Sequence, residues 1–160
     1  MTNLISLDTS SSKTGWTFFI DGKYIDHGLI DLSKSKLSSD ERIKKMCLEI
    51  LKVLDKYKPN IIAIEKMNVS RNMNAVRVLC RAIDTAYYYS ILNDVFYYEI
   101  QASQWRSLLG MQGKNRKRDD YKALSVEYVK DKLNIEVTDD EADSFCVGMA
   151  YIKLFSESEE

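Results

Sequence analysis

Four acidic residues stand where carboxylates in this 160-residue sequence could do chemistry. Asp8 interrupts the apolar run NLISLDT, and a charge inside such a strand is costly unless a site compensates it. Glu65 ends a second apolar run, NIIAIE, at the strand end where open α/β sheets form ligand sites. Asp140 and Asp143, in TDDEAD, are three residues apart and so share one face of a predicted helix. We predict that these four side chains converge.

Carboxylates that crowd together repel one another and raise one another's pKa unless cations neutralise them. Hard divalent ions with a preference for oxygen, Mg²⁺ with Mn²⁺ as its substitute, fit such a cluster. Two ions about 3.5 to 4 Å apart can activate water and stabilise the leaving oxygen of an in-line phosphoryl displacement. The acids therefore predict a two-metal site for phosphodiester hydrolysis, in which Asp8, Glu65, Asp140 and Asp143 are catalytic residues and metal ligands.

The same acids also have purely structural explanations. Asp139, Asp140 and Glu141 lie near a helix N-terminus, where acids cap the helix and interact favourably with its dipole. Glu65 is also explained as the first exposed residue after a strand. Asp8 is the hardest to explain in this way, because nothing favours a carboxylate inside an apolar strand.

The order of the predicted elements brings these acids into one fold. Strands are predicted at residues 3–9, 16–21 and 23–31, with a tight turn at Asp21-Gly22, and further strands at 60–65 and 95–101. A helix is predicted to begin near residue 38 and to end before Pro59, and further helices are predicted at 76–91, 103–109, 119–133 and 138–155. This order is that of a ribonuclease H-like α/β domain, a mixed five-stranded sheet of three antiparallel then two parallel strands with helices on both faces. Its first and fourth strands are neighbours, which places Asp8 beside Glu65.

Composition indicates one globular domain, expected at residues 1–155 and followed by a short acidic tail at 156–160. Hydrophobic residues make up 45% of the chain and charged residues 29%, a globular balance. No apolar run approaches the roughly 20 residues of a membrane span, and the N-terminus lacks a signal-peptide pattern, so a cytoplasmic protein is expected. Cys47, Cys80 and Cys146 show no CxxC spacing and are interpreted as reduced core residues.

Three segments carry a resemblance to a known family. LISLDTSSSKTGW, IIAIEKMN and DDEADSFCVGMAY, in this order and at these intervals, resemble the RuvC family of Holliday junction resolvases, whose fold is ribonuclease H-like. The likeness covers roughly residues 3–152 and implies that the four acids are the family's metal ligands. It further implies that Thr14-Gly15 form the turn into the second strand and that Gly148 lets the last helix lie close to the sheet.

The chain also departs from the family's pattern. The family commonly has Pro-Gly after its first aspartate, and this chain has Thr9-Ser10. Many members carry an aromatic residue shortly after the glutamate, where Met67 and Asn68 stand here. Some members have histidine in place of Asp140, whereas the only histidine of this chain, His27, is interpreted as structural or exposed.

Two basic segments fit a nucleic-acid partner despite a net charge of −1. Residues 66–81 contain four basic residues and no acid, and residues 104–122 contain six basic residues against two acids. Such segments bind phosphates without reading sequence, or else are solvated helix faces. The predicted DNA-binding residues are Lys66, Arg71, Arg77, Lys114, Arg116, Lys117 and Arg118.

The resemblance implies a Mg²⁺-dependent endonuclease that resolves Holliday junctions, and other branched DNA, by paired symmetric nicks. In the family a helix after the glutamate-bearing strand helps to form a twofold homodimer. Here that helix is 76–91, with Val76, Ile83 and Tyr87 predicted at the interface unless its apolar residues only cover the sheet.

Two other functions stay open at this point. One is a ribonuclease H-type nuclease acting on RNA–DNA hybrids, and the other is a branched-DNA-binding module without catalysis. Lysine, asparagine, isoleucine and tyrosine are abundant, which is typical of AT-rich genomes and suggests a bacteriophage or its host.

Overall fold

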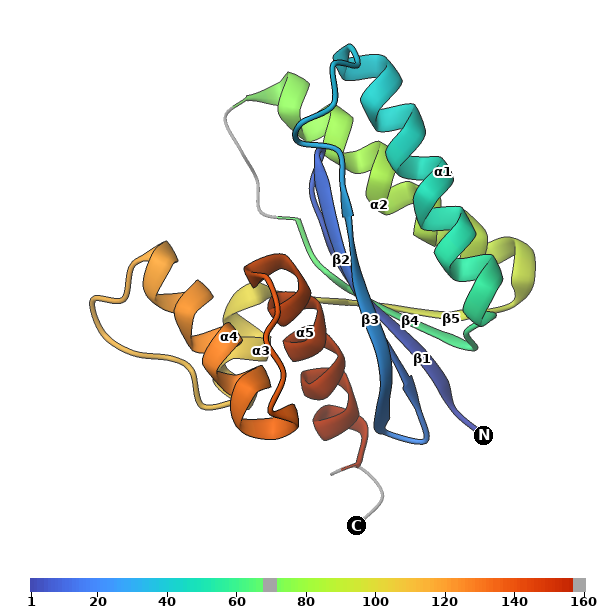
Figure 1. The fold of residues 1–160 in the computed structure, drawn as a ribbon. Helices are drawn as coiled ribbons and strands as arrows, with labels where there is room; N and C mark the ends of the chain where they lie inside the picture. The colour runs from blue at the N-terminus through green and yellow to red at the C-terminus, as the bar shows by residue number, and fades with distance from the viewer. Residues whose placement is uncertain (68–71, 157–160) are drawn as a thin grey trace.

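The computed structural model describes residues 1–67 and 72–156 and has a five-stranded sheet at its centre (Figure 1). The strand order is β3-β2-β1-β4-β5. β1 pairs antiparallel with β2, β2 pairs antiparallel with β3, and β4 and β5 run parallel to β1. The strands are β1 (Asn3–Thr9), β2 (Lys13–Ile20), β3 (Lys23–Asp31), β4 (Ile61–Glu65) and β5 (Phe96–Ile100). The predicted mixed sheet is confirmed.

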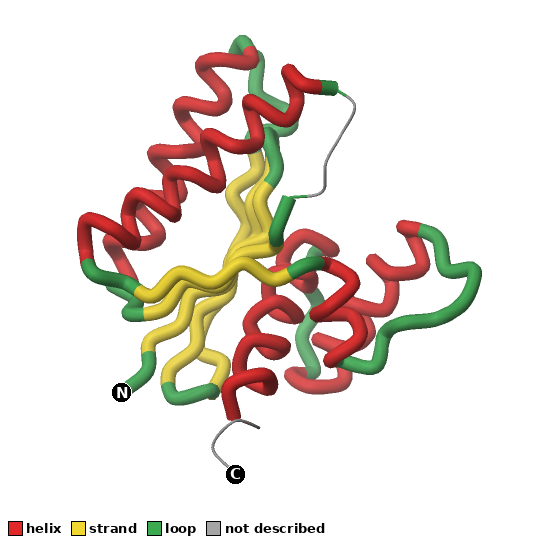
Figure 2. The backbone as a smooth tube through the Cα atoms, turned by 180° about the vertical axis from the view of Figure 1, so that it is seen from behind, coloured by secondary structure: helices red, strands yellow, loops and turns green. Residues whose placement is uncertain are grey.

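Helices cover both faces of this sheet (Figure 2). One face carries α1 (Ser39–Tyr57) and α2 (Met73–Asn93), and the other carries α3 (Ala102–Leu108), α4 (Arg118–Leu133) and α5 (Asp139–Ser156). The predicted helices all form, with ends that differ by at most three residues. In the described part of the chain, no helix is both long and apolar enough to cross a membrane.

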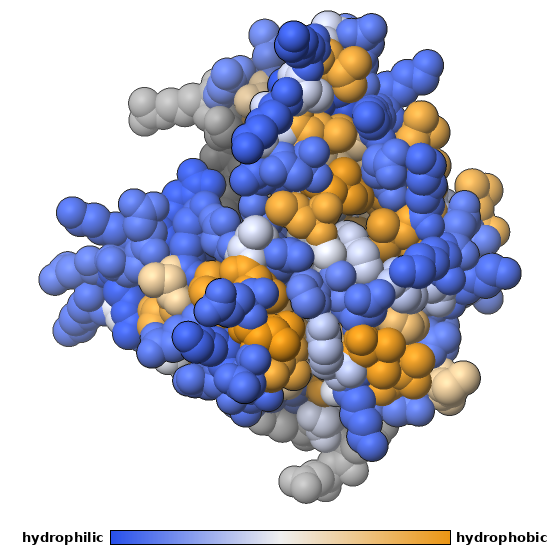
Figure 3. Space-filling model, in the orientation of Figure 1, coloured by the Kyte–Doolittle hydropathy of each residue, from blue (hydrophilic) through white to orange (hydrophobic). Residues whose placement is uncertain are grey.

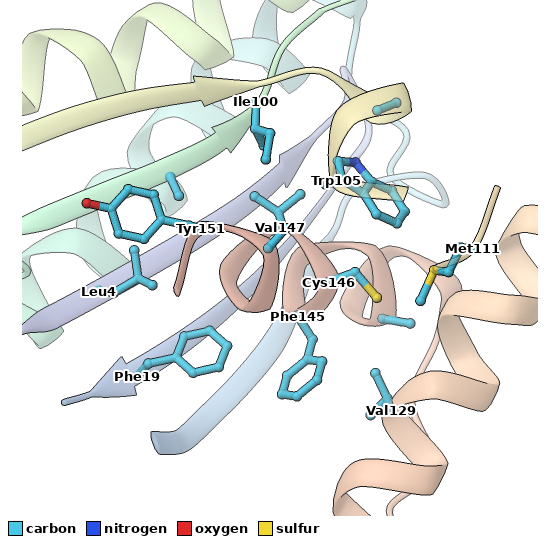
Figure 4. Close-up of a cluster of buried hydrophobic side chains, with 14 residues drawn as sticks. Leu4, Phe19, Ile100, Trp105, Met111, Val129, Phe145, Cys146, Val147 and Tyr151 are labelled. Carbon is cyan, nitrogen blue, oxygen red and sulfur yellow. The ribbon is translucent and has the colours of Figure 1, made fainter. Parts of the chain in front are cut away.

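Side-chain alternation along β1 divides the hydrophobic core in two. Leu4 faces the cluster under α5, whereas Ile5 and Leu7 face the cluster under α1 and α2. Along β4, Ala63 faces α5 and Ile62 faces the opposite cluster. Figure 4 shows the α5 side of this core, where side chains from the strands meet those of the helix. The alternation decides which strand residues can reach α5.

Helix α5 lies very close to the sheet because its contact residues are small or hydroxylic. A Cβ atom on Gly148 would stand 2.3 Å from the Phe19 ring and 2.7 Å from the Ser6 hydroxyl. The Ser6 hydroxyl donates to the carbonyl of Ser144 at 2.7 Å, and the Ser144 and Thr17 hydroxyls are 2.8 Å apart. The expected role of Gly148 fits this contact.

The structure differs from the expectations for the second strand and the cysteines. β2 begins at Lys13 instead of residue 16, because Thr14 and Gly15 pair with the last residues of β1 and shorten the turn. Cys146 is buried as expected, but Cys47 and Cys80 are only half-buried and are not core residues.

The expectation that Ile83 faces outward at a dimer interface is wrong. Only 8% of Ile83 is exposed, because it lies on the same face of α2 as Ala86 and packs into the core under α1 and α2. Val76 is half-buried and Tyr87 is 46% exposed. Residues 157–160, the greater part of the expected tail, lie outside the described residues.

The contact at Gly148 generates a stability prediction. Gly148→Ala should lower the free energy of unfolding by about 1–3 kcal/mol, because the added methyl collides with a buried ring and hydroxyl. This loss opposes a gain in helix propensity of about 1 kcal/mol. Urea denaturation checks the sign, and a more stable variant would show that α5 is free to move away from the sheet.

Candidate active site

Strand register places Asp8 and Glu65 side by side at one edge of the sheet. Leu7 of β1 pairs with Ile64 of β4, so the residues that follow them are adjacent. Alternation then turns Asp8 to the same face as Ser6, which contacts α5. The same alternation turns Glu65 to the face of Ala63. Both strand carboxylates therefore lie on the side covered by α5.

The first turn of α5 is placed beside Asp8 by a glycine. Gly15 pairs with Asp8 in the sheet, and a Cβ atom on Gly15 would stand 2.0 Å from the carbonyl oxygen of Asp140. Any side chain at this position would push the helix away. Gly15 therefore lets Asp140 reach the strand carboxylates.

A capping box at the start of α5 separates the acids that cap the helix from those that do not. The backbone N–H of Thr138 donates to Glu141 at 2.8 Å, and the N–H of Glu141 donates to the Thr138 hydroxyl at 3.3 Å. Glu141 also lies 3.6 Å from His27, whose other ring nitrogen is 2.7 Å from the Tyr24 hydroxyl. Glu141 is thus the capping residue, which leaves Asp140 available to the site.

All four predicted acids line one pocket of about 420 Å³, which we call the acid pocket. Two arise from strand ends and two from α5, as the sequence pattern predicted. Three cationic side chains and one tyrosine complete its lining, namely Arg106, Arg118, Lys122 and Tyr121. An acidic floor with a basic rim can hold cations and receive an anion that approaches them.

Mutual repulsion and burial act on the strand carboxylates. Burial, followed by the charges of Glu65, Asp143, Asp140 and Asp139, raises the pKa of Asp8 well above its usual range. Burial also raises the pKa of Glu65, although the hydrogen bond from Trp105 and the charge of Arg106 oppose this rise. Both carboxylates hold protons more readily than exposed acids do.

The three aspartates at the start of α5 differ in their pKa shifts, because two of them lie beside a lysine. Burial raises the pKa of Asp143 to about 6. Burial and the charge of Asp139 raise the pKa of Asp140, which Lys13 partly opposes from 3.7 Å away. Asp139 instead forms an ion pair with Lys122, and this hydrogen bond lowers its pKa.

The acid pocket fits divalent cations by the chemistry of its donors. All four acids offer hard carboxylate oxygens, and Oδ1 of Asp143 is buried without a hydrogen-bond partner among the described residues. Among residues 1–67 and 72–156, however, no three acidic, histidine or cysteine side chains form a complete ligand set as they stand.

The predicted DNA-binding residues divide into several groups. Arg118 lines the acid pocket, and Lys114 lines a neighbouring hollow with Tyr121. Arg116 donates to the carbonyl of Met111 within its own loop. The remaining described residues of this set, Lys66, Arg77 and Lys117, are exposed and do not line the acid pocket, and Arg71, like Asn68, lies outside the described part of the chain.

Several site residues carry no signal that sequence reasoning used. The guanidinium of Arg106 lies 4.8 Å from the centre of the Trp105 ring and 4.5 Å from that of Tyr121. Lys13 and Lys122 pair with acids of α5. Arg106 and Lys122 belong to the basic segment at 104–122, which could have indicated them as site residues. No local pattern indicates Lys13, Trp105 or Tyr121.

Fold and pocket together define a class of protein, the ribonuclease H-like α/β domains with clustered carboxylates at the ends of the central strands. The model of one family, described as crossover junction endodeoxyribonuclease RuvC, matches residues 4–150. This chain belongs to that family.

Comparisons with individual proteins agree with this assignment. The RuvC protein of Ehrlichia ruminantium (strain Welgevonden) is 30% identical over 86 residues, which are 50% of this chain and 54% of that protein. The chain thus spans about half the length of this relative. The RuvC protein of Caldicellulosiruptor saccharolyticus is 28% identical over 141 residues, 88% of this chain and 81% of that protein.

Two solved structures share the fold. T. thermophilus RuvC in complex with a Holliday junction substrate superimposes with a TM-score of 0.76 at 13% identity and covers 98% of this chain and 96% of its own. Fowlpox virus resolvase with substrate Holliday junction DNA superimposes with a TM-score of 0.61 at 17% identity, covering 96% and 99%. The mixed sheet with helices on both faces is therefore the RuvC fold.

The raised pKa of Asp143 generates a prediction about stability and pH. Its pKa is about 6 in the folded protein against 3.8 for a free side chain, so the folded state binds the proton more tightly. Stability from this group is fully present below about pH 4 and is lost as pH rises through about 6. Replacing it should therefore stabilise the metal-free protein at pH 8, by up to about 3 kcal/mol, and change little at pH 4.

Urea unfolding of Asp143→Asn in EDTA at both pH values tests this expectation. Asp131→Asn, at an exposed position near the end of α4, is the matched control and should change the free energy of unfolding by the same amount at both pH values. An equal effect of Asp143→Asn at pH 4 and pH 8 would rule out a raised pKa at this side chain.

Proposed function

We propose that this chain is a Mg²⁺-dependent, structure-selective endodeoxyribonuclease that resolves Holliday junctions and other branched DNA by paired symmetric nicks. The observation that carries the proposal is the convergence of Asp8, Glu65, Asp140 and Asp143 on one pocket. Membership of a family described as crossover junction endodeoxyribonucleases supports it. So do the titles of two structural neighbours, which describe complexes with Holliday junctions.

The four acids would hold two Mg²⁺ ions, for which Mn²⁺ would substitute. When bound, such ions activate a water molecule and stabilise the leaving oxygen of a phosphodiester. The protein's own contribution is to hold the carboxylates together and orient them. Lys13 and Lys122 place positive charge next to Asp140 and Asp139, which reduces the repulsion within the cluster.

A basic rim receives the phosphate that enters the acid pocket. Arg106, Arg118 and Lys122 line the pocket beside the carboxylates. Arg106 is held between two aromatic rings, so its guanidinium is already oriented before an anion arrives. The DNA backbone can therefore be positioned without contacts to bases.

The lobe next to this rim offers further phosphate contacts. It consists of α4 and the loop before it, where Lys114 and Lys117 are exposed. Figure 3 shows this lobe, on the left of the view, as a largely hydrophilic surface. Lys66 and Arg77, which follow β4 in the chain, are also exposed. Basic residues in two separate segments suit branched DNA, whose arms diverge, better than a single straight duplex.

The exposed surface of α2, on the side of the sheet opposite α5, fits a second copy of the chain. Four large apolar side chains are exposed there near the end of α2: Tyr87 (46%), Tyr88 (62%), Ile91 (58%) and Leu92 (83%). Contiguous exposed apolar surface is typical of an interface. A twofold dimer presents two identical sites, which paired nicks in symmetric strands require.

Cleavage should depend on the acids while DNA binding does not. Asp8→Asn and Glu65→Gln should each abolish detectable cleavage of a four-way junction in Mg²⁺, a loss of at least about 1,000-fold, because each removes a charge that holds the ions. Junction affinity should stay the same or rise, because repulsion of phosphates is reduced. Gel assays of cleavage and binding measure both quantities.

The same gels separate the competing functions. Matched linear, forked and four-way DNA and an RNA–DNA hybrid are compared in Mg²⁺ and in EDTA. Preferential cutting of the hybrid would indicate a ribonuclease H-type enzyme, and binding of branched DNA without any cutting would indicate a module without catalysis. An Asp8→Asn variant that cuts at the normal rate would show that the acid pocket is not the active site.

The dimer has its own test. Leu92→Glu places a charge on the exposed apolar surface and should give a monomer in sedimentation equilibrium, with unchanged circular dichroism. Leu48→Glu, at a half-exposed apolar position on α1, is the matched control and should stay dimeric. A wild-type protein that remains monomeric even on junction DNA would overturn the dimer.

A further inference from the structure

Trp105 belongs to the core, yet its single polar atom reaches the acid pocket. No part of its surface is exposed, and its indole Nε1–H donates a 2.7 Å hydrogen bond to Oε2 of Glu65. An indole has one donor and no acceptor, so this bond uses all of its hydrogen-bonding capacity. The buried core is thereby connected to one carboxylate of the pocket.

The ring is held in one place by its surroundings. Trp105 packs in the cluster that includes Ile100, Met111 and Cys146 (Figure 4). Its helix, α3, begins only two residues after the end of β5, and the backbone N–H of Trp105 donates to the carbonyl of Gln101 at 3.1 Å. Close packing of this kind restricts a large side chain to one rotamer. The direction of the N–H is therefore set before any ligand binds.

The neutral donor at Glu65 differs from the charged partners of Asp139 and Asp140. Asp140 and Asp139 are paired with lysines, and each lysine offsets the negative charge that would attract a cation. The indole N–H orients Glu65 without adding positive charge. Because it occupies Oε2, the other oxygen, Oε1, is left for a ligand in the pocket.

We propose that Trp105 is a positioning residue for divalent-cation binding, which acts by fixing the carboxylate of Glu65. This inference rests on the proposed function, because it assigns Trp105 a task at the same pocket. Loss of a hydrogen-bond partner of a metal-ligating side chain typically reduces metal affinity or activity about 10- to 100-fold. Trp105 is expected to have an effect of this size although it touches neither cation nor DNA.

The test removes the N–H and keeps the shape of the side chain. The full chain is prepared with benzothienylalanine at position 105, in which sulfur replaces the indole N–H, and with Trp105→Phe as a second variant. The same isostere at Trp16, which packs on Tyr57 away from the acid pocket, is the matched control. Calorimetry with Mn²⁺ alone, without DNA, measures cation affinity, and thermal unfolding in EDTA measures stability.

Benzothienylalanine at position 105 should lower Mn²⁺ affinity about 10-fold or more. The cleavage rate at limiting Mn²⁺ should fall as well. The melting temperature should match that of the control.

Unchanged Mn²⁺ affinity of this variant, when the wild-type enzyme cuts junctions, would overturn the positioning role and leave the proposed function intact. A wild type that binds Mn²⁺ but cuts no branched DNA would overturn the proposed function, and the affinity difference would still establish the role of Trp105. A wild type that binds no Mn²⁺ would overturn both.

Discussion

Close contact between helix α5 and the sheet is the constraint on which the rest of this structure depends. Gly15 and Gly148 have no side chain at the points where α5 and the sheet approach most closely, and Ser6 and Ser144 form a hydrogen bond across the contact. A helix packed over larger side chains would lie farther out, with its acids away from the strand ends. The distance between α5 and the sheet therefore determines whether two strand carboxylates and two helix carboxylates share one pocket.

That contact has an electrostatic cost, and the protein offsets it in different ways. Asp8 and Asp143 remain in a buried, repulsive environment that raises their pKa. Lysines offset the charge of Asp139 and Asp140. Glu65 is instead oriented by a neutral indole. Clusters of like charges that reduce stability in this way are typical of functional sites. A divalent cation in the acid pocket would relieve the repulsion that the fold creates.

The two faces of the sheet carry different surfaces. The face under α5 ends at the acid pocket with its basic rim, whereas the layer of α1 and α2 carries the exposed tyrosines and aliphatic residues at the end of α2. Strand alternation separates these surfaces, since neighbouring residues of β1 and β4 point to opposite faces. Under the proposed function, substitutions on opposite sides of one sheet would therefore affect cleavage and dimer formation separately.

The sequence by itself determined the elements and the four acids, because both follow from local patterns. Alternating and apolar runs specify β1 and β4, and their register follows from the fold order, so Asp8 and Glu65 are recognisable from the order of residues alone. Asp140 and Asp143 follow from helical spacing, although spacing alone does not show that Glu141 caps the helix.

Only the tertiary structure decided the partners of these acids. Trp105 and Glu65 are 40 residues apart, and the burial of Ile83 depends on which face of α2 meets α1. Such contacts are set by how elements pack, and periodicity along the chain carries no information about the side chain that lies opposite.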